Sequence, residues 1–405
     1  MRSFVAAYVA VLALLAGLGV LGGVLLYAAS GPDDAAEAAA DGHAYDFLSW
    51  EVEHFPRKWI YKVRHLFDER SATEEEEVLQ RYFDLVTEIG GASSDERVRE
   101  AEVERTAIEA EVEDIVEGRL TAVLEGQSLA IEPPLFSDLG LVFPPVDFEL
   151  DAPPRVLAVS PRDRIELGQS FLLEPGLERE EFEAIEDEAE LDNGPATGIS
   201  TVVVGTGGVA TYPAVVSASA TYQHMVDTAF HEWTHQYLAF YPLGRSYFAG
   251  SDLRTLNETA ANLAGTALAG EYFKRYPRME AKPTPAPTAA PTASPGARFD
   301  FTAEMRALRR QVEDMLALGE VTKAEALMEQ KRSELAGHGY FIRKLNQAYF
   351  AFHGSYADTP GSIDPIGPKM EALLKEAGSP GSFVKLVSGI TSRAELDRVL
   401  AEAAE

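Results

Sequence analysis

The spacing of hydrophobic residues predicts a buried helix between Ser217 and Phe240. This stretch contains neither Gly nor Pro. Its apolar side chains recur at steps of three and four residues, which places them on one broad face of an α-helix: Tyr222, Met225, Val226, Ala229, Phe230, Trp233 and Tyr237. We expect Ser217 or Ser219 to cap the start of this helix, and the breakers Pro242 and Gly244 to end it.

The rest of the pattern predicts an α+β fold that is mainly helical, with a small sheet beside the 217–240 helix. Runs with helical periodicity occupy 74–89, 94–124, the acidic stretch after Leu177, 253–276, 301–318, 322–336 and 338–352. Runs rich in β-branched residues predict strands at 155–161, 163–175, 199–204 and 209–216. We expect the last three helices to close the functional site from the side opposite the 217–240 helix.

The amino-terminal stretch Phe4–Tyr27 predicts a membrane anchor. It has 24 residues without a charge, whereas a membrane span needs about 20 and the apolar part of a signal peptide about 7–15. Arg2 precedes it, and Asp33, Asp34 and Glu37 follow it. The positive-inside rule therefore predicts a single-pass protein whose body lies outside the cytoplasm.

Four segments follow the anchor in the predicted organisation. Residues 28–44 are rich in Ala, Asp and Gly and are expected to form a flexible tether. Residues 45–126 are a helical region; its aromatic and basic part, 45–67, either lies at the membrane interface or packs on the body, and 74–124 serves as a stalk or as packing. Residues 127–405 form the main domain. Within them, 281–297 is a Pro/Thr/Ala sequence that is expected to be a disordered loop.

Composition excludes several classes of function. The formal net charge of −30 argues against nucleic-acid binding, which needs clustered Lys and Arg. The chain has no Cys, so disulfides, thiol catalysis and thiolate-built structural zinc sites are all excluded.

The clearest chemical signal is His231-Glu232-Trp233-Thr234-His235, which reads H-E-x-x-H within the predicted helix. Two imidazoles at positions i and i+4 share one helix face and can bind one metal ion, while the intervening Glu can act as a base. The alternative is a pair of ordinary core histidines, which would leave Glu232 buried without a partner. A catalytic zinc site needs a third protein ligand, and the best candidate downstream is Glu258, in Asn257-Glu258-Thr259-Ala260-Ala261-Asn262.

H-E-x-x-H followed by N-E-x-x-A on the next helix resembles the gluzincin group of zinc peptidases. The longer pattern HEWTHQ…NETAA, in a chain with an amino-terminal membrane segment, is similar to a family of predicted bacterial membrane-anchored aminopeptidases. The resemblance implies that His231, His235 and Glu258 bind Zn²⁺ and that Glu232 is the general base in the hydrolysis of a peptide or protein substrate. It also implies that an edge strand near the zinc helix, 199–204 or 209–216, binds the substrate backbone, although an ordinary strand pair fits equally well.

The chain departs from the gluzincin pattern at three places. The interval between the motifs is longer, with 244–252 as the extra loop. Asn262 stands where thermolysin-like members have an Asp that orients a metal-bound histidine. The segment 207–213 lacks the glutamate with which alanyl-aminopeptidase-like enzymes bind the substrate amine, so aminopeptidase and endopeptidase activities both stay open.

The family also uses a downstream Tyr or His to stabilise the transition state. The candidates in this chain are His338, Tyr340, Tyr349, His353 and Tyr356, of which Tyr340 is preferred. The alternative to an enzyme is a non-catalytic, membrane-anchored scaffold or binding module that retains a gluzincin fold; the presence of both His, Glu232 and Glu258 argues against it.

Overall fold

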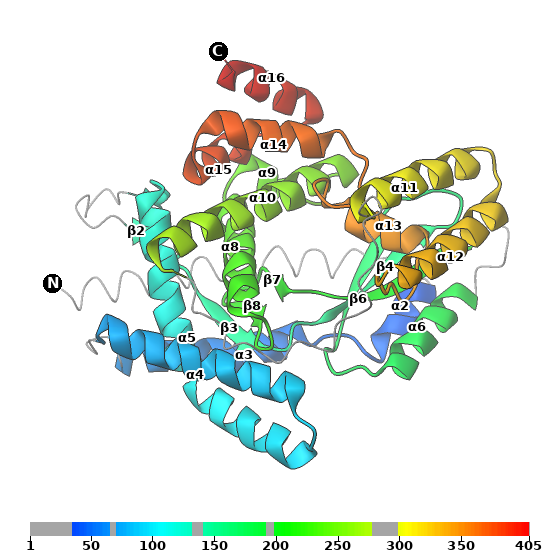
Figure 1. The fold of residues 1–405 in the computed structure, drawn as a ribbon. Helices are drawn as coiled ribbons and strands as arrows, with labels where there is room; N and C mark the ends of the chain where they lie inside the picture. The colour runs from blue at the N-terminus through cyan, green and yellow to red at the C-terminus, as the bar shows by residue number, and fades with distance from the viewer. Residues whose placement is uncertain (1–34, 65–69, 132–140, 192–197, 278–298, 405) are drawn as a thin grey trace.

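The computed structural model describes residues 35–64, 70–131, 141–191, 198–277 and 299–404. The predicted anchor at 4–27 and the Pro/Thr/Ala segment at 281–297 lie outside these ranges. The fold is α+β and mainly helical, as the sequence predicts (Figure 1).

Helices dominate the described residues. They are α2 (Ala35–Asp41), α3 (Phe47–Arg64), α4 (Ala72–Gly91), α5 (Asp95–Gly126), α6 (Arg179–Leu191), α8 (Tyr222–Leu238), α9 (Pro242–Arg245), α10 (Ser251–Arg275), α11 (Phe301–Ala317), α12 (Val321–Gly337), α13 (Gln347–Gly354), α14 (Ile366–Ala377), α15 (Pro380–Ser388) and α16 (Arg393–Ala403).

The strands form three small sheets. They are β1 (Ala130–Ile131), β2 (Leu141–Val142), β3 (Phe148–Asp151), β4 (Arg155–Pro161), β5 (Gln169–Leu173), β6 (Ile199–Gly205), β7 (Gly208–Val209) and β8 (Ala214–Ser217). One sheet has the order β5-β4-β6 and is antiparallel throughout. A second has the order β3-β8-β7, with β3 parallel and β7 antiparallel to β8. The pair β1-β2 is separate.

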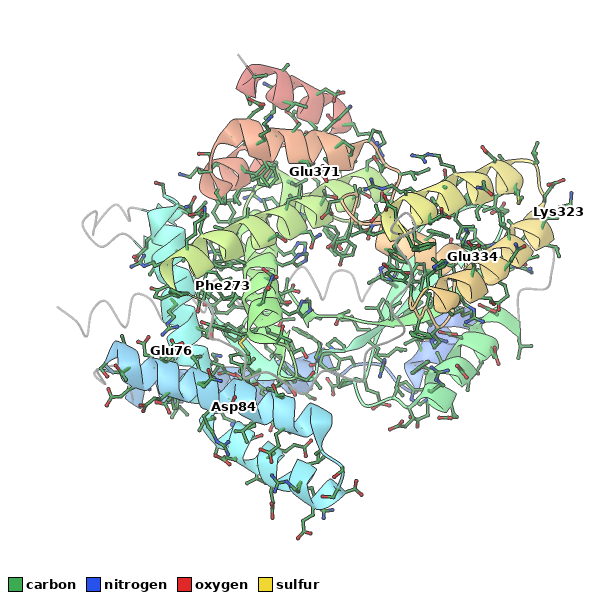
Figure 2. All side chains as sticks on the ribbon, in the orientation of Figure 1. Glu76, Asp84, Phe273, Lys323, Glu334 and Glu371 are labelled. Carbon is green, nitrogen blue, oxygen red and sulfur yellow. The ribbon has the colours of Figure 1, made fainter. Side chains whose placement is uncertain are left out.

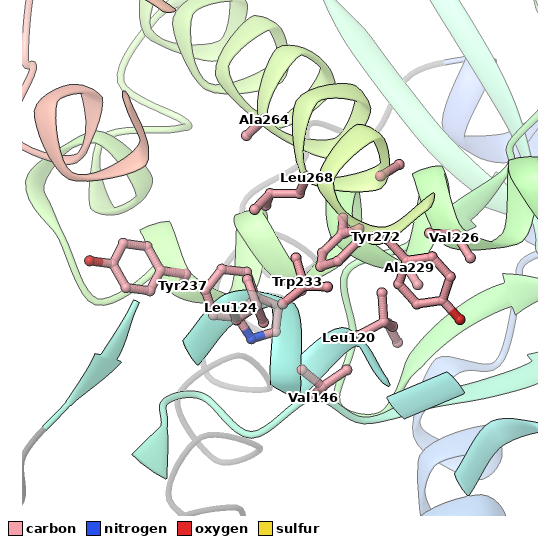
Figure 3. Close-up of a cluster of buried hydrophobic side chains, with 14 of the residues drawn as sticks. Leu120, Leu124, Val146, Val226, Ala229, Trp233, Tyr237, Ala264, Leu268 and Tyr272 are labelled. Carbon is pink, nitrogen blue, oxygen red and sulfur yellow. The ribbon is translucent and has the colours of Figure 1, made fainter. Parts of the chain in front are cut away.

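The largest core lies around α8, which stands upright in Figure 1 with α10 crossing at its upper end. Trp233 on α8 and Leu268 on α10 are buried against Leu120 and Leu124 of α5 (Figure 3). Trp233 also donates a hydrogen bond from Nε1 to the carbonyl of Pro144 at 2.9 Å. One face of α8 is thus buried in the apolar core, and the opposite face carries the two histidines of the motif.

The β5-β4-β6 sheet lies between two groups of helices in Figure 1. Helices α2 and α6 pack on one side, where Ala36, Leu157, Phe182 and Val203 share a buried cluster. Helix α13 packs on the other side, and α11 and α12 pack beside it around Phe350. Charged side chains line the outer faces of the helices, and Lys323 points outward at the edge of the molecule (Figure 2).

Helices α3 to α5 are joined to the β3 edge of the second sheet by buried charges. Lys58 of α3 lies 2.8 Å from Glu113 and 3.1 Å from Glu117, both on α5. These carboxylates accept hydrogen bonds from the backbone N–H groups of Leu150, at 2.7 Å, and Phe148, at 3.0 Å. The contacts pack this helical region against the sheet that borders α8.

Residues 35–44, expected to belong to a flexible tether, are ordered against the body. Ala36, Ala39 and Ala40 of α2 are buried. Ala44 forms an antiparallel bridge with Leu173 of β5. Ala-rich sequence favours a helix, and small side chains allow close packing, so this part of the prediction was wrong.

Three element boundaries also differ from the prediction. Helix α8 is capped by Thr221, whose hydroxyl accepts from the His224 N–H at 3.3 Å; Ser217 instead ends β8. The strand expected at 163–175 begins only at Gln169, because the residues before it form the loop of the β4-β5 hairpin. The helix expected from His338 begins at Gln347, since Gly339 has φ +89°, which interrupts a right-handed helix.

No helix among residues 35–64, 70–131, 141–191, 198–277 and 299–404 combines the length and the apolar character that a membrane span requires.

Candidate metal centre

The two histidines of the motif and Glu258 come together at the crossing of α8 and α10. His231 Nε2 and His235 Nε2 lie 3.0 Å apart. Glu258 Oε2 lies 3.3 Å from His235 Nε2 and 3.8 Å from His231 Nε2. One helix turn separates the histidines, and the neighbouring helix brings in the carboxylate, as the sequence predicts for a three-ligand site.

A glycine allows the two helices to approach this closely. A Cβ at Gly265, two turns after Glu258 on α10, would lie 3.0 Å from the Asp227 carbonyl oxygen and 3.2 Å from the His231 backbone nitrogen. Any larger residue would push α10 away from the part of α8 that carries His231. The small side chain therefore sets the distance between the two ligand-bearing helices.

The donor set fits a zinc ion. A tetrahedral centre with bonds of about 2.0–2.1 Å separates its ligand atoms by about 3.3 Å, and the three observed separations, 3.0, 3.3 and 3.8 Å, bracket that value. Glu258 Oε2 is also buried without a hydrogen-bond donor. A buried carboxylate oxygen without a donor is costly, and a cation held between it and the imidazoles would satisfy it.

Asn257 and Tyr247 orient the ligands. Neither role was predicted from the sequence. Asn257 Oδ1 lies 2.7 Å from His235 Nδ1 and accepts a hydrogen bond from its N–H, which directs Nε2 toward Glu258. Tyr247 donates a hydrogen bond to Glu258 Oε1, which leaves Oε2 for the metal. Such partners fix the tautomer and direction of metal ligands. Asn257 lies within the motif and could have been found; Tyr247 lies in the loop before α10, with no sequence signal.

Asn262 has a different role from the one that its alignment with the thermolysin-like Asp suggests. Its amide donates to Asp358 Oδ2 at 2.5 Å. Thr259, also on α10, accepts from the Ala357 N–H at 2.9 Å. The two α10 side chains therefore hold the 357–358 segment, and this places Tyr356 beside the centre.

Of the five candidates for transition-state stabilisation, Tyr356 lies at the centre. Its ring centroid is 6.2 Å from that of His231. Burial and the nearby Glu258 carboxylate raise the Tyr356 pKa well above its ordinary value, so its hydroxyl stays protonated and able to donate. The preferred candidate, Tyr340, stacks on Phe301 at 4.5 Å on the α11-α12 side, and this preference was wrong.

The other three candidates contact side chains away from the metal ligands. His338 stacks on Phe299 with ring centroids 4.0 Å apart. Tyr349 and His353 contact each other, with centroids 4.3 Å apart.

Glu232 lies between the ligands and the β7 backbone. It is 5% exposed, and a Cβ at Gly208 would lie 2.8 Å from Glu232 Oε1. Burial raises the pKa of Glu232 to about 8. A carboxyl group with a pKa near neutrality can take up and release a proton at working pH, which is the property required of a general base.

The three candidate metal ligands shift one another's pKa values. Burial and the neighbouring His235 lower the pKa of His231 to about 3, so His231 is neutral with a free lone pair. Burial opposes the charged forms of His235 and Glu258, but their mutual attraction prevails: the His235 pKa rises to about 9 and the Glu258 pKa falls to about 2. Without a metal, His235 therefore carries the positive charge nearest to Glu258 Oε2, 3.3 Å away, but its ring N–H is not aligned to donate a hydrogen bond to that oxygen. Metal binding at neutral pH must release the His235 proton.

The two strands proposed for backbone binding differ in how their outer edges are occupied. On β6, the Val203 N–H donates to Glu186 at 2.6 Å and the Thr201 N–H donates to Glu190 at 2.8 Å. The Thr201 carbonyl accepts from Asn346 at 2.8 Å. These side chains already satisfy the β6 edge. Strand β7 ends its sheet beside Glu232, and no strand of the described residues pairs with its outer side.

Comparison with known protein families, curated proteins and solved structures gave no significant match.

Proposed function

We propose that this protein is a zinc-dependent peptidase. The observation that carries the proposal is Glu258 Oε2, a buried oxygen without a donor that lies 3.3 Å from His235 Nε2. Glu232 belongs, with His231 and His235, to a cluster of side chains close enough to hold a metal ion. Structural ion pairs normally satisfy their buried oxygens, so the arrangement favours a metal centre with an adjacent base.

The residues supply the steps of peptide hydrolysis in this proposal. When bound, zinc would lower the pKa of a water molecule to about 7 and polarise the substrate carbonyl. Glu232 accepts the proton of the attacking water and delivers it to the leaving amine. The Tyr356 hydroxyl donates a hydrogen bond to the carbonyl oxygen as negative charge develops on it.

The outer edge of β7, with which no strand of the described residues pairs, supports a peptide rather than a small molecule as substrate. An extended chain can pair with such an edge through backbone hydrogen bonds, and Gly208 brings this edge against Glu232. No acidic side chain occurs in residues 207–213, so nothing on this strand favours an aminopeptidase over an endopeptidase. The apolar stretch at 4–27 supports an anchored protein with its body outside the cytoplasm.

The full-length protein in detergent micelles provides the test. It should bind zinc after chelation and reloading, and should cleave peptides from a mixed library only when loaded. Glu232→Gln should retain zinc and lose at least about 100-fold in rate, because general-base catalysis contributes about 10²–10⁴-fold. Glu271→Gln, the same substitution on the α10 surface, serves as the control.

Absence of zinc binding, or equal cleavage by the parent and Glu232→Gln, would overturn the proposal. Zinc binding without any cleavage would favour the non-catalytic scaffold instead.

A further inference from the structure

Arg254 lies beside the candidate metal centre. It is one helical turn before Glu258 on α10, so the two side chains emerge on the same face. Its guanidinium carbon lies 5.9 Å from the centre of the Tyr247 ring. Tyr247 in turn donates its hydroxyl hydrogen to Glu258. A positive charge is thus held next to the residues that would hold zinc.

The Arg254 guanidinium has most of its hydrogen-bonding capacity left. Its hydrogen bond to the protein runs from Nη1 to the Leu167 carbonyl at 3.3 Å, and no carboxylate of the described residues pairs with it. By contrast, Arg393, near the same end of α10, lies 2.7 Å from both Asp252 and Asp364. In a chain with 65 acidic and 35 basic residues, a half-buried arginine without an acidic partner is available for a ligand.

We propose that Arg254 binds a carboxylate of the peptide on which the metal centre acts, an inference that rests on the proposed peptidase function. A guanidinium presents five donors in a planar fork that matches a carboxylate. The net charge of −30 otherwise repels acidic peptides, so a local cation is needed to hold one.

The geometry limits where that carboxylate lies along the substrate. One helical turn is about 5.4 Å, and an extended peptide spans about 3.3–3.6 Å per residue. The carboxylate therefore belongs within one or two residues of the bond that is cleaved. Either a carboxy-terminal α-carboxylate or an Asp or Glu side chain provides this group.

The test is a binding measurement on zinc-loaded, full-length Glu232→Gln in detergent micelles. Three libraries of mixed-sequence pentapeptides serve as probes: free carboxylates with neutral side chains, carboxamides with neutral side chains, and carboxamides with one Asp or Glu. Retained peptides are quantified by mass spectrometry. We expect the first or the third library to be retained at least about 10-fold more than the neutral carboxamides, since hydrogen bonds to charged groups are strong.

Substitution of Arg254 in the same background should remove this preference. Arg254→Gln should retain all three libraries about equally, and Arg254→Lys should keep part of the preference because it keeps the charge. Arg275→Gln is the matched control: this arginine, at the other end of α10, also donates from Nη1 to one carbonyl, that of Ala122 at 2.9 Å, and lies 5.5 Å from a tyrosine ring centre. It should leave the preference unchanged.

The inference fails if the parent retains the neutral carboxamides equally well, or if the preference survives in Arg254→Gln. A purely structural role for Arg254 would weaken the retention of all three libraries alike, and would also overturn it. Cleavage is measured separately with Glu232 intact. If no library is cleaved while the Arg254-dependent preference persists, the peptidase proposal fails and the carboxylate site stands.

Discussion

The two edges of the β3-β8-β7 sheet differ in the groups that cover them. At the β3 edge, Glu113 and Glu117 accept backbone N–H bonds from the strand, and Lys58 donates to the Phe148 carbonyl. Lys58 also lies 3.6 Å from Asp147. Side chains of α3 and α5 thus take the place of a neighbouring strand, and the Lys58 ammonium lies among their carboxylates inside the protein.

The β7 edge is short, and it faces Glu232. Here the nearest buried carboxylates are those of the candidate metal centre, and one of their oxygens, Glu258 Oε2, has no donor. The comparison shows that burial of charged groups does not by itself indicate function. Each cluster has a carboxylate oxygen without a donor, Asp147 Oδ2 at β3 and Glu258 Oε2 near β7. At β3, however, two lysines lie among the carboxylates, whereas the ion pairs of Glu258 are with histidines alone among the described residues.

Substitution of Lys58 by Met should give the largest effect, because it leaves the Glu113 carboxylate buried without its cation. Removing one partner of a buried ion pair costs about 3–5 kcal/mol, and we expect a loss of that size in the free energy of unfolding measured by chemical denaturation. The matched control is Lys323→Met, whose side chain is 69% exposed; its effect should stay within about 0.5 kcal/mol. Similar results for both variants would show that the β3 edge does not depend on its charges.

Gly208→Ala should disturb the β7 edge to an intermediate degree. The new Cβ would lie 2.6 Å from the Val215 carbonyl oxygen and 2.8 Å from Glu232 Oε1. Overpacking of this kind costs about 1–3 kcal/mol, and displacement of Glu232 should also slow any zinc-dependent cleavage. Gly205→Ala, at the end of β6, is the control, since its Cβ would meet no atom within 4 Å. Unfolding and cleavage are measured on both; equal behaviour would contradict the close approach of β7 to Glu232.

Glu51→Gln should have no effect on stability near pH 5, and its effect should grow as the pH rises. Burial, with a contribution from Asp147, raises the pKa of Glu51 from 4.5 to about 8. The unfolded chain ionises near pH 4.5 and the native protein only near pH 8, so the native protein loses stability as pH rises across this window. Glu51→Gln removes that loss: its melting temperature should match the parent near pH 5 and exceed it near pH 8.5. A constant difference between the two pH values would refute this.

The sequence predicted the helix of the H-E-x-x-H motif and the convergence of His231, His235 and Glu258, because these follow from local spacing. Periodicity of apolar residues determines which face of α8 is buried, so the histidine face is fixed as well. The position of Asn257, adjacent to Glu258, belongs to the same local information.

The partners that come from distant parts of the chain could not be predicted in this way. Tyr356 lies at the centre because Thr259 and Asn262 bind the neighbouring residues 357–358. Tyr340 instead stacks on Phe301. Both tyrosines have equally plausible sequence contexts. Tertiary contacts decide between them, as they also decide that β6 is occupied by side chains while β7 is not.

The contact at Gly265 separates the geometry of the candidate centre from the length of the loop that precedes α10. His231 and Glu258 keep their distance because the two helix backbones approach closely at Gly265, whereas the connection between Leu238 and Ser251 supplies Tyr247, which orients Glu258. Insertions or deletions in that connection that keep Tyr247 in place should therefore leave the distance between the ligands unchanged. A distant relative is better recognised by a small residue seven positions after the glutamate of N-E-x-x-A than by the interval between the two motifs.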